Sequence, residues 1–517
     1  MGAFLILYKV ISNYFCYYYN CDIILSESAV FVVIRSLYII IFTSILVLLS
    51  ACGSKDSITL INRETGAKQK ILVLDQDIYD LSLFPQTLDG YYIKYSTSKS
   101  GTYINSDESF RIIDNTLYYS YGIKEDFFDI KNIGKVDIVC QNNPTTNKEY
   151  VESYITISGE GEKVAASAQI KLRGNTTLWT PKKSFKIKFN EKQNVLGMGS
   201  DKEWALLANY FDPTYLRNYY AYKLAMALGL EYSCEARFVE VYFNHQYIGL
   251  YLLTETVKTS KERVNIEKTT TSSEVPFLLE LDMKIVQDNP NYILTLDDEM
   301  FLLDNTEYNG KTYPFGTKYP KSFKDLNDNQ YAYIKNYISN TFESVREGNY
   351  EEYIDIDSFI NYFLIQELFM NVDLDYSSLY MYKAVGEKLK FGPIWDFDLS
   401  SGNVGYVKGY SYDKMMKDVN GGSYLFNELY KYDDFKYLLS NRFDEINLDI
   451  IPSLLNSIYK NREALHNFAK KDNLKWDVLN DKNWARPENL VGLSYNNQVR
   501  YFKDFLANHN EWLKENM

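Results

Sequence analysis

Histidine is scarce in this chain, and its scarcity argues against one large class of enzymes. Only three histidines occur in 517 residues, at His245, His466 and His509. Zinc hydrolases bind their metal through histidines at short, regular spacings, and these three have no such spacing. The sequence therefore argues against a zinc-dependent hydrolase.

Three glycine-containing motifs are also missing. No Gly-x-Ser-x-Gly elbow occurs, which argues against an α/β-hydrolase. No Gly-x-x-x-x-Gly-Lys-Ser/Thr loop occurs, and Leu196-Gly-Met-Gly is too short to replace it. The Gly-x-Gly-x-x-Gly loop of ordinary protein kinases is absent as well. Any phosphate binding must then depend on other backbone amides and on arginine or lysine.

An excess of positive charge is lacking too, because the formal net charge is −13. Nucleic-acid binding needs a basic surface to neutralise phosphates, so we expect no nucleic-acid partner. The apolar fraction of 46% can supply a sizeable core, and the length allows two or three domains.

Cysteine is rare, and one cysteine has an informative position. Arg35 precedes the apolar stretch 37–49, which is shorter than the roughly 20 residues of a membrane span and leads into Leu49-Ser-Ala-Cys52. This pattern predicts a secretion signal and resembles the bacterial lipobox. The resemblance implies lipidation of Cys52 and anchoring to the outer face of a bacterial membrane. An ordinary N-terminal anchor is the alternative.

The segment before this signal fits it poorly. Residues 1–34 carry Asp22 and Glu27, which suggests a wrongly assigned start codon, although a second hydrophobic anchor is also possible. Beyond Cys52 only Cys140 and Cys234 follow, either as a disulfide in an oxidising compartment or as two separate buried thiols.

Changes in pattern divide the sequence into four predicted parts. Residues 1–51 are the signal region, and 52–134 are a polar tether with a small β-rich domain. Residues 135–430 form the core, and 431–517 are its helical C-terminal extension. Short strand-like runs between turn residues predict a small sandwich for the β-rich domain. The expected fold class is α+β.

Local patterns within the core predict several elements. Phe185–Phe189 alternates apolar residues with lysines, which is typical of a half-buried strand. A helix is predicted over 213–228, with Asp212 as its N-cap and Gly229 just past its end. We further expect a hairpin at 237–254, an insertion at 285–330, and helices at 330–345, 356–370 and several places from 424 to 515.

Residues 391–403, Phe-Gly-Pro-Ile-Trp-Asp-Phe-Asp-Leu-Ser-Ser-Gly-Asn, are the most informative stretch. Asp396 and Asp398 end an apolar run, and in an extended strand both carboxylates would project from the same face. Asp373 lies upstream, just after the apolar helix-like run 359–370. Such acids suit a divalent-cation site for phosphoryl transfer, although acids that cap surface turns would give a similar pattern.

Further blocks occur in a fixed order along the chain. They are Lys171-Leu-Arg-Gly-Asn-Thr-Thr, Pro181-Lys-Lys-Ser-Phe-Lys-Ile-Lys-Phe, Asp201-Lys-Glu-Trp-Ala-Leu-Leu-Ala-Asn-Tyr, Leu216-Arg-Asn, Gly249-Leu-Tyr-Leu-Leu-Thr-Glu, Leu278-Leu-Glu-Leu-Asp, Asn371-Val-Asp and Trp395-Asp-Phe-Asp. In this order the blocks resemble the CotH (spore-coat protein H) kinase family, over roughly residues 135 to 450.

The resemblance implies an atypical protein-kinase-like, two-lobe fold that uses ATP and Mg²⁺ or Mn²⁺. Its implied reaction is transfer of the γ-phosphate to a protein hydroxyl, on Ser or Thr. Asp373 takes the place of the catalytic-loop acid and Asp396 that of the metal-binding acid, with Asp398 as a second metal ligand. Ser378 stands where ordinary kinases have an asparagine that holds a second metal, which puts a two-metal site in doubt.

Four residues are candidates for nucleotide binding. Lys188 is the expected phosphate lysine, with Lys186 as its competitor on the same strand face. Arg173 and Arg217 could each contact phosphate or brace a carboxylate. Glu255 ends an apolar strand and could pair with the lysine or mark the adenine site. We expect Lys188 and Glu255 on one side of a cleft and the acids on the other.

Two other functions compete with a kinase. A catalytically inactive CotH-like surface binding or adhesion protein would keep the fold without turnover, but retention of both Asp373 and Asp396 argues against it. A glycoside hydrolase would need paired carboxyls at a defined separation, which a sequence does not give.

Overall fold

The computed structural model describes the backbone of seven strands between residues 55 and 121. It also describes residues 124–517, except 125, 160, 269–272, 283–299, 304–312, 375–376, 409 and 420–423. The chain forms two compact units, Met1–Gly122 and Ile123–Met517. The predicted boundary lay somewhat later, at residue 134. Cys52 and the apolar stretch 37–49 lie outside the described residues.

The first unit is a small β structure. One sheet has the order β2-β1-β7-β5-β4, in which β1 and β7 are parallel, and β3 pairs with β6. Its strands are β1 (Lys55–Asn62), β2 (Lys68–Leu74), β3 (Tyr79–Asp80), β4 (Thr87–Leu88), β5 (Tyr91–Ser96), β6 (Ser109–Phe110) and β7 (Thr116–Tyr121). Within the region predicted to be β-rich, the described strands thus form one five-stranded sheet and a short pair.

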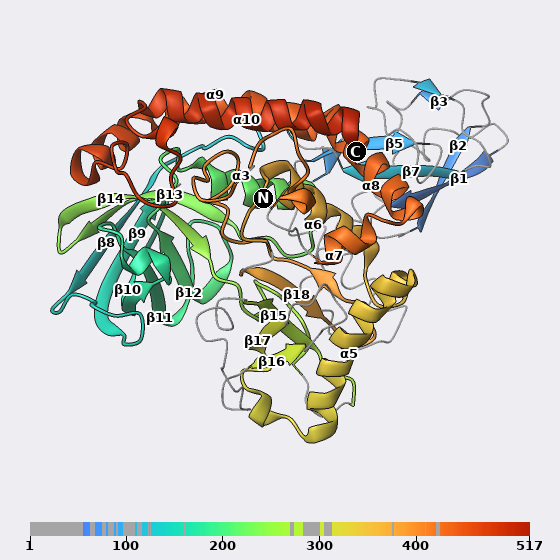
Figure 1. The fold of residues 1–517 in the computed structure, drawn as a ribbon, viewed down its shortest axis with the longest axis horizontal. Helices are drawn as coiled ribbons and strands as arrows, with labels where there is room; N and C mark the ends of the chain where they lie inside the picture. Colours follow the sequence, from blue (N-terminus) through green and yellow to red (C-terminus); the bar gives the residue numbers. More distant parts are fainter. Residues whose placement is uncertain are drawn as a thin grey trace. The chain divides into compact units, whose positions relative to one another are not determined.

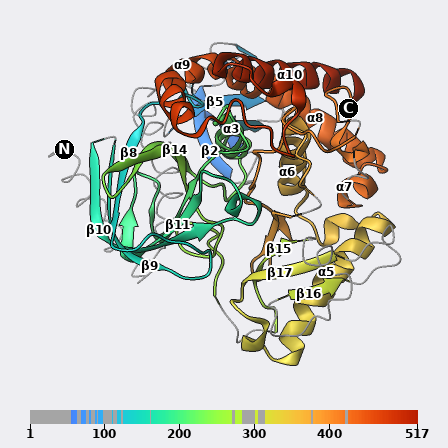
Figure 2. The same cartoon turned by 60° about the vertical axis from the view of Figure 1, so that its left-hand side comes forward.

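The second unit begins with a closed seven-stranded barrel, in the order β10-β11-β12-β14-β13-β8-β9 (Figures 1 and 2). The strands are β8 (Gly134–Cys140), β9 (Val151–Gly159), β10 (Glu162–Arg173), β11 (Ser184–Asn194), β12 (Ser200–Leu207), β13 (Ala236–Phe243) and β14 (Gln246–Glu255). Alternate residues fill the interior, among them Ile170, Phe185, Ile187, Trp204, Val239 and Leu253. The predicted alternation at 185–189 and the hairpin at 237–254 are confirmed.

Helix α3 (Leu216–Ala227) packs between the barrel and the C-terminal helices (Figure 1). Its N-cap is Tyr215 with φ +64°, so the prediction of Asp212 as N-cap is wrong. Asp212 still stabilises the helix start, because its Oδ2 accepts the backbone N–H of Arg217 at 2.9 Å. At the other end Gly229 has φ +79°, and the N–H groups of Gly229 and Leu230 close the C-terminal turn.

A second sheet follows, in the order β16-β17-β15-β18-β19. Its strands are β15 (Phe277–Leu281), β16 (Met300–Leu303), β17 (Tyr313–Tyr319), β18 (Leu379–Lys383) and β19 (Lys390–Phe391). Because β16 and β17 pair with each other and β17 with β15, the stretch predicted as an insertion contributes strands to this sheet. Helix α5 (Asp328–Glu347) lies beside it (Figure 2).

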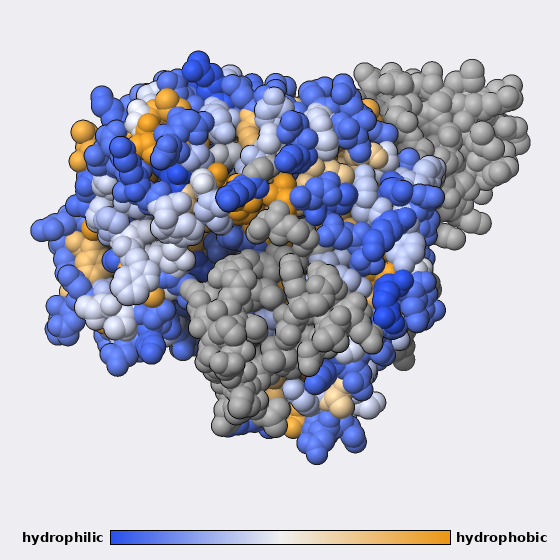
Figure 3. Space-filling model, in the orientation of Figure 1, coloured by the Kyte–Doolittle hydropathy of each residue, from blue (hydrophilic) through white to orange (hydrophobic). Residues whose placement is uncertain are grey.

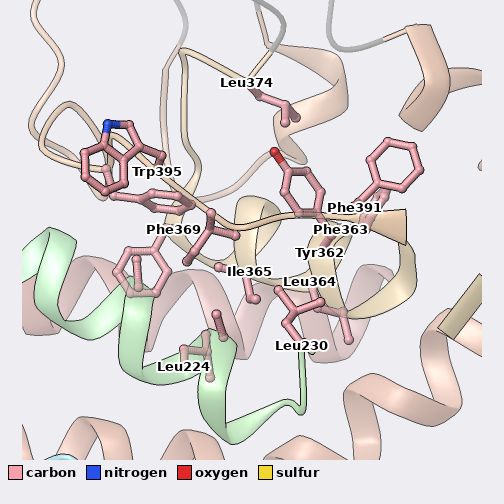
Figure 4. Packing of buried hydrophobic residues seen from close by; sticks show 14 of the residues in the cluster. Leu224, Leu230, Tyr362, Phe363, Leu364, Ile365, Phe369, Leu374, Phe391 and Trp395 are labelled. Atoms are coloured by element: carbon pink, nitrogen blue, oxygen red, sulfur yellow. The ribbon is translucent and has the colours of Figure 1, made fainter. Parts of the chain in front are cut away.

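The remaining elements are helices, as predicted. They are α6 (Ile356–Phe369), α7 (Tyr424–Leu429), α8 (Asp433–Leu448), α9 (Ile450–Trp476) and α10 (Tyr495–Asn516). Figure 4 shows α6 side chains such as Phe363 and Phe369 beside Leu224 of α3 and beside Phe391 and Trp395. The core therefore reaches the segment that carries Asp396.

The face shown in Figure 3 is mostly hydrophilic, with small apolar patches. Among the helices of the described residues, none combines the length and hydrophobicity needed to cross a bilayer. Cys140 and Cys234 are both free, buried thiols rather than a disulfide.

Candidate active site

Asp373 is placed by the end of helix α6. The helix begins at the N-cap Asp355, whose side chain accepts the Ser358 N–H, and it ends at Met370 in the left-handed conformation. Asn371 then accepts the backbone N–H of Asp373 at 3.3 Å, while its own amide donates to Gln366 at 3.0 Å. The turn that carries Asp373 is therefore tied to a fully packed helix.

Asp396 and Asp398 lie in a turn rather than in a strand. Strand β19 ends at Phe391, and Asp396 has φ +63°, so the prediction of an extended strand here is wrong. Phe397 between the two acids is fully buried edge-on against Phe369, with ring centroids 5.5 Å apart. Asp396 and Asp398 are each partly exposed, although protein atoms surround most of each carboxyl group.

The three carboxyls interact electrostatically. Burial, and then the charge of Asp396, raise the pKa of Asp373 to about 7. Burial, followed by the charges of Asp396 and Asp373, raises the pKa of Asp398 well above its ordinary value. The pKa of Asp396 is also raised, first by burial, although Arg173 opposes the shift. This concentration of negative charge is typical of a site that binds a cation.

Arg173 faces these acids from the end of strand β10. Its guanidinium lies 4.7 Å from the ring centroid of Trp395, the residue before Asp396. Another charged neighbour of Asp396 is Glu280 on β15, which accepts a hydrogen bond from the Tyr380 hydroxyl at 2.6 Å and pairs with Lys318 at 2.6 Å. The barrel and the second sheet thus both contribute charged side chains to one site.

A family comparison covers the part of the chain that carries these residues. The family described as CotH kinase protein matches residues 170–513, which is more than half of the chain. The chain belongs to the CotH kinase family. A comparison with curated proteins finds no match. The matched region runs from β10 to α10, so Arg173, the three acids and the C-terminal helices all lie within the CotH region.

Arg217 stabilises the backbone of the CotH site. It is buried and pairs with Asp212 at 2.5 Å. Its Nε donates to the carbonyl of Ser400 at 2.8 Å, and its Nη2 to that of Ser401 at 3.2 Å. Of the two roles left open for Arg217, these contacts support the brace. Arg217 fixes the turn that follows Asp398.

The structure does not bring Lys188 to the acids of the CotH site. Lys188 is exposed on the outer face of β11, with its amino group 5.8 Å from the Tyr150 ring centroid. In the part of the chain that is described, no interaction joins it to Asp373 or Asp396. Lys186 precedes Lys188 by two residues on β11 and is therefore nearer to Ser184, the residue that lies opposite Arg173. Lys186 pairs with Glu203 at 2.6 Å and lies opposite Lys171 in the β10–β11 register.

Glu255 lies at the end of β14 and pairs with a different cation. Its Oε1 is 2.5 Å from Nη1 of Arg263, which stacks on Trp204, and its Oε2 accepts the Glu235 N–H. Burial raises the pKa of Glu255 to about 8, and Arg263 opposes the shift. No described contact joins Glu255 to Lys188 or to the acids.

The carboxylates of this site include possible ligands for a divalent metal ion. Among the described residues, no group of three or more His, Cys, Asp or Glu side chains is arranged to hold a metal. Mg²⁺, however, usually takes only one or two carboxylates and completes its shell with water and phosphate oxygens. Asp396 and Asp398 fit that smaller requirement. Ser378, which hydrogen-bonds to Asp396, adds a hydroxyl.

Several residues of this site were missed from sequence. Three of them lie in or near the blocks that resemble the CotH family: Lys171, Glu280 and Tyr406. The blocks alone did not indicate a role for these three residues. Asn209 is buried with φ +50°, and within the described residues its amide has no hydrogen-bond partner. Asn209 follows strand β12, and only the fold brings that strand end close to Ser184, whose hydroxyl accepts the Ala208 N–H at 3.0 Å.

Proposed function

We propose that this CotH family member is an ATP-dependent protein kinase that transfers the γ-phosphate to a Ser or Thr hydroxyl with the help of Mg²⁺ or Mn²⁺. The observation that carries the proposal is that Asp373, Asp396 and Asp398 lie close enough to interact electrostatically, with Arg173 beside Asp396. The CotH match supports a kinase-like protein and gives no support to an inactive surface protein.

Asp396 and Asp398 are the side chains that would hold the metal. A bound ion would neutralise negative charge on the phosphates. Arg173 contributes a fixed positive charge beside Asp396, and its stacking on Trp395 limits its freedom. A planar guanidinium suits two phosphate oxygens at once.

Lys186 is a better phosphate lysine than Lys188. It lies two residues nearer to the strand end that carries Arg173, and Glu203 orients it in the manner of a lysine–glutamate pair. Lys171 lies opposite, and its pKa is lowered first by burial and then by the charge of Lys186. Clustered lysines of this kind favour an anion between them.

Asp373 has the position and protonation chemistry of an acceptor-orienting acid. Its pKa of about 7 lets the carboxylate accept a proton near neutral pH. It would hold the acceptor hydroxyl and take its proton as the oxygen bonds to phosphorus.

We also propose that the protein acts outside the cell, anchored through Cys52, where its substrate would be a surface or spore-coat protein.

Calorimetric titration of ATP tests the proposal. With Mg²⁺ present we expect the full chain to bind ATP, and we expect Asp396→Asn to abolish the metal-dependent part of binding. Lys186→Ala should weaken binding by about 10-fold or more, as loss of a contact to a charged group does. Lys188→Ala, on the same face of the same strand, is the matched control and should bind normally. A wild-type protein that binds no nucleotide would refute the proposal.

A further inference from the structure

Tyr406 links Asp373 to the protein surface. Its hydroxyl lies 3.4 Å from Oδ1 of Asp373 and donates a hydrogen bond to it. Among the described side chains, Tyr406 is the only one with a hydrogen bond to this carboxylate, and Oδ2 accepts none. One oxygen of Asp373 is therefore held, and the other is left for a ligand.

The ring of Tyr406 is held by a second aromatic residue. It lies against Trp484, with ring centroids 5.1 Å apart, and Trp484 packs edge-on against Phe211 at 6.3 Å. Tyr406 is 42% exposed and Trp484 is 59% exposed. The two rings form an exposed surface next to Asp373, which we call the Tyr406–Trp484 shelf.

The backbone beneath the shelf leaves little room for movement. The Gly405 N–H donates to the Ala485 carbonyl at 2.8 Å, and a Cβ on Gly405 would lie 2.6 Å from the carbonyl oxygen of Arg486. Arg486 is itself buried and donates to the carbonyls of Val478 and Leu490. The two loops that carry Tyr406 and Trp484 are thus packed backbone to backbone.

The charges around the Tyr406–Asp373 contact favour the phenol as donor. Asp396 and Asp398 face Asp373 from the turn after β19, while Tyr406 faces it from the next loop. Burial, and then the charge of Asp373, raise the pKa of Tyr406 far above neutrality. Tyr406 therefore keeps its proton and always donates.

We propose that Tyr406 is a positioning residue for Asp373 and marks the side of the site from which the acceptor hydroxyl enters. This inference rests on the proposed kinase function. With Oδ1 held, Oδ2 takes the acceptor proton as the acceptor O–H bond breaks. The acceptor oxygen bonds to the γ-phosphorus, and the bond from phosphorus to the oxygen kept by ADP breaks.

Substitution of Tyr406 by phenylalanine tests the role because it removes the hydroxyl and keeps the ring on Trp484. In Tyr406→Phe we expect kcat for phosphate transfer to fall about 10-fold, the low end for a hydrogen bond to a charged group. ATP affinity and the KM for ATP should not change. Tyr412→Phe is the matched control, since Tyr412 is 43% exposed and its ring packs against Phe505.

A double-mutant cycle separates positioning from a general structural effect. If Tyr406 acts through Asp373, adding Tyr406→Phe to Asp373→Asn should cause no further loss of kcat. Normal kcat in Tyr406→Phe, a loss that persists in the Asp373→Asn background, or a loss confined to ATP affinity would each overturn the inference and leave the kinase proposal standing. A wild-type protein that binds ATP but transfers no phosphate would instead refute the proposed function and this inference with it.

Discussion

At the residue scale, the acids of the site concentrate negative charge in one place. The charge of Asp396 raises the pKa values of Asp373 and Asp398, whereas the charge of Arg173 opposes the rise of the pKa of Asp396. Carboxylates placed so close resist simultaneous ionisation unless a cation joins them. Their different surroundings also suggest different duties.

The first prediction separates those duties. Asp396→Asn should lose metal-dependent ATP binding together with activity, because the substitution removes a carboxylate that would bind the metal. Asp373→Asn should bind ATP almost normally but turn over about 10²-fold more slowly, the usual scale for a positioned acid–base group. Calorimetry and initial rates on both folded variants measure this. Equal effects of the two variants on ATP binding would contradict the division.

The second prediction concerns pH. The carboxylate form of Asp373 accepts the acceptor proton, and burial and Asp396 raise its pKa to about 7. Since a raised pKa keeps the group protonated at acidic pH, kcat/KM should fall roughly tenfold per pH unit below that pKa, and the fall should begin at a lower pH in saturating metal, because a cation held by Asp396 would offset the charge that raises the pKa. Rate profiles at low and at saturating metal check it. A profile already flat at about pH 5 would argue against Asp373 as the base.

At the element scale, one buried ion pair fastens the barrel to the C-terminal helices. Lys182, in the loop before β11, and Asp472 of α9 are both fully buried and lie 2.8 Å apart. Asp472 also accepts hydrogen bonds from the Tyr215 hydroxyl and the Leu250 N–H, both at 2.8 Å. Tyr215 immediately precedes α3, which carries the brace Arg217, so this contact supports the active site indirectly.

The third prediction uses a glycine beside that pair. Gly249 has φ +142°, and a Cβ there would lie 2.5 Å from Oδ1 of Asp472. Gly249→Ala should therefore disturb the buried pair and lower the free energy of unfolding by about 3 kcal/mol. Gly197→Ala is the control, since it has φ +73° but open space around it, and should cost only about 1 kcal/mol. Urea unfolding followed by circular dichroism compares them, and equal losses would contradict the account.

At the scale of the whole molecule, local patterns predicted the elements better than their assembly. The alternation of Phe185, Ile187 and Phe189 and the apolar run before Asp373 depend on neighbours in sequence, and both are confirmed. Closure of the barrel depends on distant pairings, such as β8 with β13 in parallel, which no local pattern specifies. The kinase-like two-lobe arrangement with a cleft stays a prediction.

Some features of the candidate site could likewise be predicted from the sequence, and others could not. Asp373 and Asp396 follow apolar segments and could be recognised from sequence, whereas their turn geometry could not, because no local pattern specifies the φ of +63° at Asp396. Lys186 and Lys188 share one strand face, so a period of two cannot distinguish them. Glu203 lies opposite Lys188 in the strand register, but its side chain pairs with Lys186, and this pair and the position of Lys186 nearer to the Arg173 end of the strands favour Lys186.

The fourth prediction concerns export, which the described residues do not reach. The segment from Arg35 to Cys52 predicts cleavage before Cys52 and lipidation of its thiol. Cys52→Ala should release the protein from the membrane fraction or block its processing, as judged by fractionation and intact mass. Unchanged mass and membrane association would leave an ordinary anchor as the better explanation.

The most direct test of the central claim is transfer of labelled γ-phosphate. The purified protein is incubated with labelled ATP and Mg²⁺ or Mn²⁺ and an unfolded protein acceptor, and labelled residues are identified by mass spectrometry. The account predicts metal-dependent label on Ser or Thr of the acceptor or of the protein itself, abolished in Asp396→Asn. Absence of label from folded wild-type protein that binds ATP, or equal label in Asp396→Asn, would contradict it.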